Sequence, residues 1–249
     1  MELFSIPQGG NMFSLVLPTF NERSNIGPLI ERVEAVLNRE PIDFEIILVD
    51  DNSPDETWKL ALEIAKEDSH LQVIRREGAR GLATAVVEGW KAARGEILGV
   101  MDADLQHPPE TLPNLLKPIL RGLAEISVAS RHASGGGIGD WNLPRRIVSR
   151  GAAAIAFLLL PQTLRVIQDP MSGFFLLKRS VIGSAILRPK GYKILLEVLA
   201  KGHYRRIVEV PYVFEERKNG KSKLGPRQYL EFLMHVGMLA AKSRVHSPS

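Results

Sequence analysis

The sequence contains no cysteine, which excludes disulfide bonds, zinc-thiolate sites and cysteine nucleophiles. Any metal must therefore be held by oxygen or histidine ligands. Residues 1–12 have no basic segment followed by a long apolar one, so we expect no signal peptide and a cytoplasmic location. Histidines without a partner at metal-ligand spacing are expected to be structural or surface residues: His107, His132, His203 and His235.

Aromatic residues are also scarce, at 6% of the chain, and few of them are interleaved with the basic residues. Base stacking on nucleic acid needs such interleaving, so we expect no nucleic-acid partner. The net charge of +4 nevertheless favours anionic partners. Local basic clusters at 145–150 and 217–223 indicate phosphate-bearing small molecules and lipids.

Hydrophobic residues make up 45% and charged residues 24% of the 249-residue chain, which is typical of a folded globular protein. The length suits one large α/β domain, with or without a C-terminal addition. Strands alternate with helices, which predicts a mainly parallel central sheet covered on both faces. The expected strands lie at 13–17, 45–49, 71–74, 96–101, 126–129, 169–177 and 206–213, and the expected helices at 26–37, 56–66, 82–93, 112–120, 192–200 and 229–241.

Two helix starts are expected from side chains that cap backbone N–H groups. Ser24 or Asn25 should cap the first helix, and Asp55 the second. The turn at 18–22, before the first helix, has no cluster of glycines. A Rossmann dehydrogenase needs such glycines at its dinucleotide site, and a sugar nucleotidyltransferase needs a glycine-rich basic loop there. Both classes are therefore disfavoured.

The most informative stretch is the turn after the strand at 96–101, where Asp102 and Asp104 stand one residue apart. Open α/β sheets bind ligands beyond the carboxyl ends of their strands. A carboxylate pair there suits Mg²⁺ or Mn²⁺, which prefer oxygen ligands and bridge to phosphates, and Gln106 can add a carbonyl oxygen. The alternative is a solvated loop that caps the helix near 109–110.

Acidic residues also follow the first two strands, at Glu22 and Asp51. Parallel strands would bring these carboxylates to the same edge of the sheet as Asp102. A nucleotide can use this arrangement, because carboxylates accept hydrogen bonds from ribose hydroxyls and base N–H groups while Phe20 offers an apolar face. Taken alone, Asp51 would have turn chemistry as its simpler explanation.

The later part of the chain carries glycine-rich and basic segments. The glycine run at 134–139 favours a mobile lid, with a linker as the alternative. Arginines at 145–150 precede an apolar stretch at 151–160, which fits an interfacial helix or a core helix. The basic segment at 217–224 suits a loop that closes on phosphates, with an ordinary solvated loop as the alternative. The helix at 229–241 is expected to lie on a membrane or on a partner.

Several motifs, in this order, resemble the dolichyl-phosphate (polyprenyl-phosphate) mannosyltransferases of the inverting glycosyltransferase family 2. They are PTFNE at 18–22, VDDNSPD at 49–55, DADLQHPP at 102–109, SR at 130–131, SGFF at 172–175 and KSKL at 221–224. The resemblance implies a glycosyltransferase A-type fold for residues 1–227, followed by a C-terminal amphipathic helix and tail at 228–249.

The resemblance also implies a reaction: transfer of mannose from GDP-mannose to a polyprenyl or dolichyl phosphate, with inversion, giving polyprenyl-phosphate β-mannose. The acceptor phosphate is already largely dianionic near neutral pH, with a second pKa of about 6, so it can attack without a protein base. The enzyme would work at the cytoplasmic face of a membrane, held by peripheral contact or by a small membrane partner subunit.

Site roles follow from matched positions. The resemblance assigns the catalytic role to Asp104, Arg131 and Arg145. It assigns the metal, Mg²⁺ or Mn²⁺, to Asp102, Asp104 and Gln106. The positions implied for nucleotide-sugar binding are Pro18, Phe20, Glu22, Val49, Asp51, Asp102, Ala103, Asp104, Gln106, Arg131, Arg217 and Lys223.

Two positions depart from the family pattern: Phe20 replaces the usual tyrosine, and Glu56 stands where the family often has glycine. The nearest alternative is the same chemistry with another donor such as UDP-glucose. A transferase acting on a sugar hydroxyl would need a general base, and the acceptor-side arginines argue against it. A non-catalytic nucleotide-binding membrane subunit would bind nucleotide without metal-dependent turnover.

Overall fold

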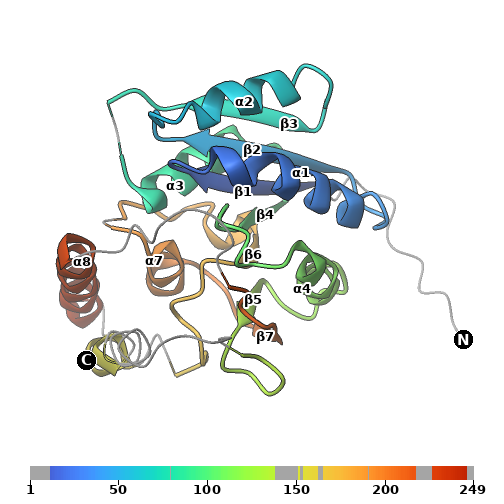
Figure 1. The fold of residues 1–249 in the computed structure, drawn as a ribbon. Helices are drawn as coiled ribbons and strands as arrows, with labels where there is room; N and C mark the ends of the chain where they lie inside the picture. Colours follow the sequence, from blue (N-terminus) through green and yellow to red (C-terminus); the bar gives the residue numbers. More distant parts are fainter. Residues whose placement is uncertain are drawn as a thin grey trace, which may run out of the picture.

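The computed structural model describes residues 12–78, 80–137, 151, 154–161, 165–189, 191–216 and 226–245, with side chains of the last segment described for 231–240. A seven-stranded sheet with the order β3-β2-β1-β4-β6-β5-β7 forms its centre (Figure 1). The strands are β1 Phe13–Thr19, β2 Phe44–Asp50, β3 Leu71–Arg75, β4 Ile97–Val100, β5 Ile126–Ser130, β6 Phe175–Lys178 and β7 Ile207–Pro211.

Strand direction confirms the mainly parallel sheet. Parallel pairing joins β2 to β1 and β3, β1 to β4, and β5 to β7. Only β6 runs antiparallel among the described strands, and it separates β4 from β5. The strand expected at 169–177 starts later, at Phe175. Residues 169–174 form the loop that precedes it.

Helices cover both faces of the sheet, because alternate strand residues point to opposite sides. Val16 packs in a core with the helix at 82–92, whereas Leu15 and Leu17 pack in a second core with the helix at 23–37. The helices are α1 Arg23–Leu37, α2 Thr57–Ile64, α3 Leu82–Ala92, α4 Leu112–Leu120, α7 Ile194–Lys201 and α8 Pro226–Val245, with 3-10 turns η1 Pro109–Thr111 and η2 Arg179–Val181.

The expected helix caps are wrong in detail. Helix α1 begins at Arg23 with Glu22 at its N-cap, and Asn25 inside the helix donates its amide to the Glu22 carboxylate at 2.6 Å. Helix α2 begins at Thr57, one residue later than a cap at Asp55 requires. The Asp55 carboxylate still accepts hydrogen bonds from the Thr57 backbone at 3.0 Å and from its hydroxyl at 2.6 Å.

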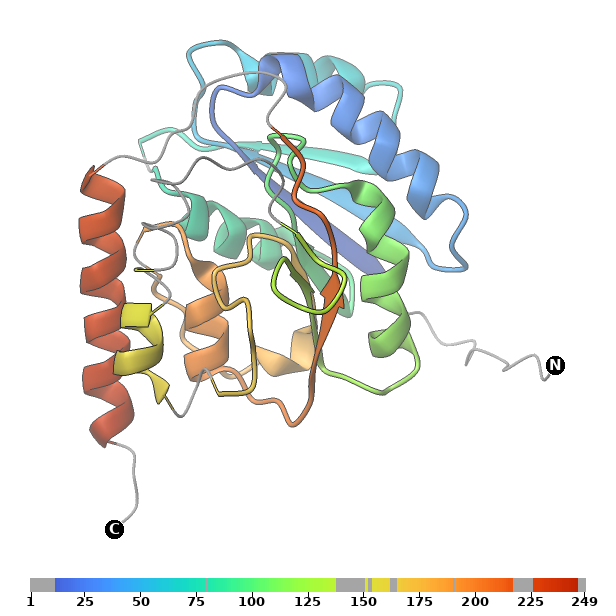
Figure 2. The same cartoon turned by 60° about the horizontal axis from the view of Figure 1, so that its bottom comes forward.

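Helix α8 lies beside α7 and beside the helical residues 154–159 (Figure 2). It runs for 20 residues, longer than the expected 229–241. A buried contact joins it to α7: the imidazole of His235 lies 2.6 Å from the carboxylate of Glu197, and both side chains are 1% exposed. Among the described residues, no helix combines the length and apolar character needed to cross a membrane.

Candidate active site

The carboxyl ends of β1, β2 and β4 meet at one edge of the sheet. These strands are adjacent and parallel, with Thr19 paired to Asp50 and Val16 paired to Val100. The loops that carry Glu22, Asp51 and Asp102 therefore leave the sheet on the same side. This arrangement is the one that the parallel strand pattern predicts.

The backbone of these loops is strained. Non-glycine residues with positive φ in the described chain are Asn21 at 53°, Asn52 at 54°, Glu56 at 59° and Leu105 at 61°. All of them follow β1, β2 or β4 at the same edge. Such conformations are costly for bulky side chains and gather at functional sites. The left-handed backbone at Glu56 also explains why glycine suits that position.

Asp51 is anchored by Arg76, a cation that no sequence motif singles out. Its carboxylate accepts a hydrogen bond from the Arg76 guanidinium at 2.6 Å and another from the Gly81 backbone N–H at 2.7 Å. Both side chains of this ion pair are buried. Asp50, by contrast, performs the turn chemistry, because its carboxylate accepts from the backbone and hydroxyl of Ser53.

The other residues expected at the nucleoside lie in the same region but differ in what they expose. The ring of Phe20 is half-buried and faces the guanidinium of Arg80 at 4.9 Å. Glu22 is buried at the start of α1. Pro18 and Val49 are neighbours across β1 and β2, and the Val49 side chain is fully buried in the core.

The turn after β4 leaves both of its aspartates accessible. Asp102 and Asp104 are partly exposed, whereas Ala103 between them is buried. The backbone N–H of Gln106 donates to Asp104 at 3.2 Å. The Gln106 amide donates to the Glu215 carbonyl at 3.0 Å, and the Glu215 N–H donates back to the Gln106 carbonyl at 2.9 Å. The turn is thus fastened to the segment after β7.

Two further residues shape the position of Asp102. A Cβ on Gly173 would lie 2.5 Å from the Asp102 carboxylate, so the backbone of the 169–174 loop packs directly against it. The imidazole Nε2 of His107 lies 3.5 Å from the same carboxylate. His107 is buried among the rings of Phe174, Tyr212 and Phe214. Sequence reasoning did not place His107 here, since no spacing rule links it to those rings.

Arg131 follows β5 and forms a buried pair with Asp169. Its guanidinium donates to both carboxylate oxygens at 2.7 Å, and its backbone N–H donates at 3.0 Å. The side chains are 9% and 1% exposed. Burial opposes both charges, but the pair raises the pKa of Arg131 and lowers the pKa of Asp169. Two of the Arg131 N–H groups are thus directed to Asp169 rather than to a substrate.

Three predicted residues, Arg145, Arg217 and Lys223, lie outside the described residues, as does part of the lid expected at 134–139.

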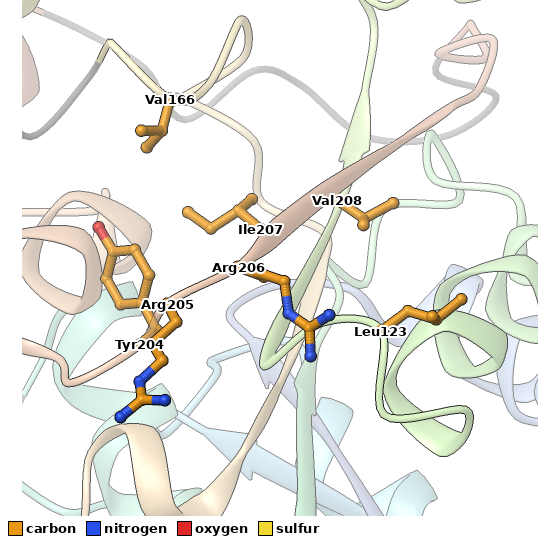
Figure 3. Close-up of a pocket in the computed structure, with 7 residues that line it drawn as sticks. All are labelled: Leu123, Val166, Tyr204, Arg205, Arg206, Ile207 and Val208. Atoms are coloured by element: carbon orange, nitrogen blue, oxygen red, sulfur yellow. The ribbon is translucent and has the colours of Figure 1, made fainter.

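Two features lie away from the site. Glu34, Asp68 and His70 have potential metal-ligand atoms within 4.8 Å of one another. A pocket of about 330 Å³ lies at the amino end of β7, the opposite sheet edge, and is lined by Leu123, Val166, Tyr204, Arg205, Arg206, Ile207 and Val208 (Figure 3).

Comparisons with known proteins give matches over most of the chain. Residues 14–184 match the model of "Glycosyl transferase family 2". A "Dolichol-phosphate mannosyltransferase" of Pyrococcus furiosus is 43% identical over 223 residues, which cover 90% of this chain and 62% of the relative. The chain therefore spans less than two thirds of that relative's length. A protein of the same name from Saccharomyces cerevisiae is 36% identical, with 90% of this chain and 85% of the relative covered.

Solved structures show a similar fold at low sequence identity. The glucosyl-3-phosphoglycerate synthase of Mycobacterium tuberculosis, in complex with Mn²⁺, uridine diphosphate and glucosyl-3-phosphoglycerate, has a TM-score of 0.68 and 21% identity. The match covers 96% of this chain and 82% of that one. The same synthase in complex with Mg²⁺ and uridine diphosphate has a TM-score of 0.66 and 20% identity, over 96% and 81% of the chains.

Proposed function

Because the chain belongs to glycosyltransferase family 2, we propose that it transfers mannose from GDP-mannose to a polyprenyl phosphate such as dolichyl phosphate, with inversion. The fold is of the glycosyltransferase A type. One observation carries the proposal: relatives named dolichol-phosphate mannosyltransferase are 36–43% identical over 90% of this chain. The match to the family model, at residues 14–184, includes the loops after β1, β2 and β4.

The donor set after β4 fits a hard divalent cation. Asp102 and Asp104 are partly exposed carboxylates on a turn that Gln106 fastens to Glu215, and the Asp102 carboxylate packs against Gly173. Oxygen ligands of this kind suit Mg²⁺ or Mn²⁺. We assign the cation to Asp102 and Asp104, with the Gln106 amide oxygen as a further ligand. When bound, the cation supplies positive charge next to the departing diphosphate.

The nucleoside is assigned to the loops after β1 and β2. The Asp51 carboxylate is held in place by Arg76 and Gly81, which suits it to accept a hydrogen bond in a fixed direction. Glu22 is buried nearby, and the half-buried Phe20 ring offers an apolar surface. Val49 can take part only through its backbone, since its side chain lies in the core.

Transfer needs alignment more than proton chemistry. An oxygen of the acceptor phosphate dianion attacks the anomeric carbon, and the bond from that carbon to the donor diphosphate breaks. The negative charge leaves with the nucleoside diphosphate, so no side chain has to remove a proton. Arg131, Arg145, Arg217 and Lys223 are the cations assigned to the phosphates.

A polyprenyl phosphate is delivered by a membrane, and apolar side chains are exposed on two adjacent helices. Leu233, Met234 and Met238 of α8 are 37–49% exposed, and Leu158 of the 154–159 helix is 79% exposed. These helices lie side by side in Figures 1 and 2. We propose that this surface contacts the cytoplasmic face of a membrane, a small membrane subunit being the alternative occupant.

Sugar transfer by the purified chain tests the proposal directly. Detergent-solubilised polyprenyl phosphate is incubated with GDP-mannose or with UDP-glucose, each with Mg²⁺, with Mn²⁺ or with a chelator. We expect metal-dependent transfer from GDP-mannose. Transfer from UDP-glucose alone would overturn the donor assignment, and nucleotide binding without any transfer would favour a non-catalytic subunit.

A further inference from the structure

Lys193 immediately precedes α7 and carries a charge that the described residues compensate poorly. Its side chain is half-buried, and its ammonium donates one hydrogen bond, to the Met171 carbonyl at 2.5 Å. The ring of Tyr192 lies 5.0 Å away. Within the described part of the chain, no carboxylate pairs directly with this ammonium. A buried ammonium with a single neutral acceptor is costly, because it has lost most of its water.

The charges around Lys193 come from the active site. Burial, together with the charge of Arg131, lowers the pKa of Lys193 to about 8. The carboxylates of Asp102, Asp169 and Asp104 oppose this shift without cancelling it. The ammonium therefore lies within electrostatic reach of the metal turn and of the Arg131 pair, but directly contacts neither.

The loop at 169–174 explains how Lys193 reaches this place. Asp169, at the start of the loop, holds Arg131 at the end of β5. Gly173, near its end, packs against Asp102. The carbonyl that binds Lys193 belongs to Met171, between these two points. Lys193 is thus joined to the side of the metal turn that faces β6 and β5, away from β1 and β2, which carry the nucleoside loops.

We propose that Lys193 binds the phosphate group of the polyprenyl phosphate acceptor, next to Arg131. The inference rests on the proposed function, because it names a residue for that acceptor. A phosphate dianion would supply the direct anionic partner that the ammonium lacks. It would also meet only part of the Arg131 guanidinium, because two of the Arg131 N–H groups are directed to Asp169. Lys193 supplies the remaining positive charge.

Steady-state kinetics of Lys193→Met and Lys193→Arg test the proposal. We expect the methionine variant to raise the KM for polyprenyl phosphate by at least about tenfold while the KM for GDP-mannose changes less than about twofold. The arginine variant should recover part of the loss because it restores the charge. Lys178→Met is the matched control: Lys178 pairs with Ile97 at the beginning of β4, on the opposite edge of the sheet, and should change neither constant.

A measurement on the unmodified protein gives a second test that does not depend on folding of a variant. Since the pKa of Lys193 is about 8, its ammonium is lost as pH rises above 8, and the affinity for polyprenyl phosphate should fall about tenfold near pH 9. Lys193→Arg, which stays charged, should not show this fall.

Binding of polyprenyl phosphate without donor separates failure of this proposal from failure of the proposed function. The probe is a short-chain polyprenyl phosphate in detergent, compared with the matching polyprenol. If the unmodified protein does not prefer the phosphate, the proposed function fails. If it does and Lys193→Met binds equally well, the role of Lys193 is refuted. A rise in the KM for GDP-mannose alone would also refute it, because Lys193 would then act on the donor diphosphate.

Discussion

Replacing Asp169 by asparagine should destabilise the protein strongly. The change keeps the size of the side chain but leaves the buried Arg131 guanidinium without its carboxylate. Breaking a buried ion pair on one side costs about 3–5 kcal/mol, which is a large share of a typical unfolding free energy of about 5–15 kcal/mol. For a protein of this size, the midpoint of thermal unfolding should fall by roughly 6–20 °C.

The chain offers a control with similar bond geometry and different burial. Arg32 donates to Glu110 through Nε at 3.2 Å and Nη2 at 2.7 Å, but the Glu110 side chain is 57% exposed. Exposed pairs contribute at most about 1 kcal/mol, so Glu110→Gln should barely change the midpoint. Thermal and urea unfolding of both variants are followed by circular dichroism. Equally small shifts of the unfolding midpoint for Asp169→Asn and Glu110→Gln would refute the reasoning that burial makes the Arg131 pair contribute strongly to stability.

The pH dependence of the unfolding free energy tests the same ion pair. The pKa of Asp169 is lowered in the folded state, so its contribution is present above the unfolded pKa of about 3.9 and is lost as pH falls through the lower folded value. The difference in stability between the unmodified protein and Asp169→Asn should therefore stay constant from about pH 6 to 8 and shrink in acid. A difference that grows in acid would contradict the assignment.

Three further changes test other parts of the structure. Asp104→Asn should lower metal-dependent turnover by at least about a hundredfold, since the cation's charge is worth several kcal/mol in the transition state; near-normal turnover would refute the metal assignment. Gly173→Ala should reduce metal affinity and turnover at least about tenfold because its Cβ would lie 2.5 Å from the Asp102 carboxylate, whereas Gly27→Ala, with open space at that position, should not. Although burial opposes its charge, hydrogen bonds from His235 and Lys201 lower the pKa of Glu197 to about 2. Glu197→Gln should therefore lower the free energy of unfolding by up to about 3 kcal/mol above pH 4.3, and this difference between the two proteins should disappear as pH falls toward 2. Equal free energies of unfolding in urea at pH 7 would contradict this prediction.

Sequence pattern predicts the part of the fold that depends on local periodicity. The alternation of apolar strands and helices gives the parallel order around β1, because each strand and its helix lie next to each other in the chain. The antiparallel β6 is different: its partners β4 and β5 end 75 and 45 residues before it begins, and no local signal sets its direction. The predictions of the helix caps were wrong for a similar reason. The left-handed backbone of Glu56 and the turn at Glu22 depend on contacts between the loops after β1 and β2.

The same limit separates the site residues that the sequence indicates from those that it does not. Asp102 and Asp104 are visible because a carboxylate pair follows an apolar strand. Asp169 and His107 are not, since their roles come from Arg131, 38 residues away, and from rings at 174, 212 and 214. In the sequence, Lys193 is an ordinary lysine at the start of a helix. Only the structure of the 169–174 loop shows that its ammonium lies near the carboxylates of the site.

The reciprocal hydrogen bonds between Gln106 and Glu215 have a consequence for the basic residues that follow. Glu215 is fixed to the metal turn by these bonds, and Arg217 and Lys223 follow it in the chain. Lys223 lies eight positions along the chain, so it stays within roughly 25–30 Å of the metal turn whatever path the chain takes. On the proposed assignment of the donor diphosphate to this turn, the length of the chain therefore limits how far Arg217 and Lys223 can lie from the diphosphate.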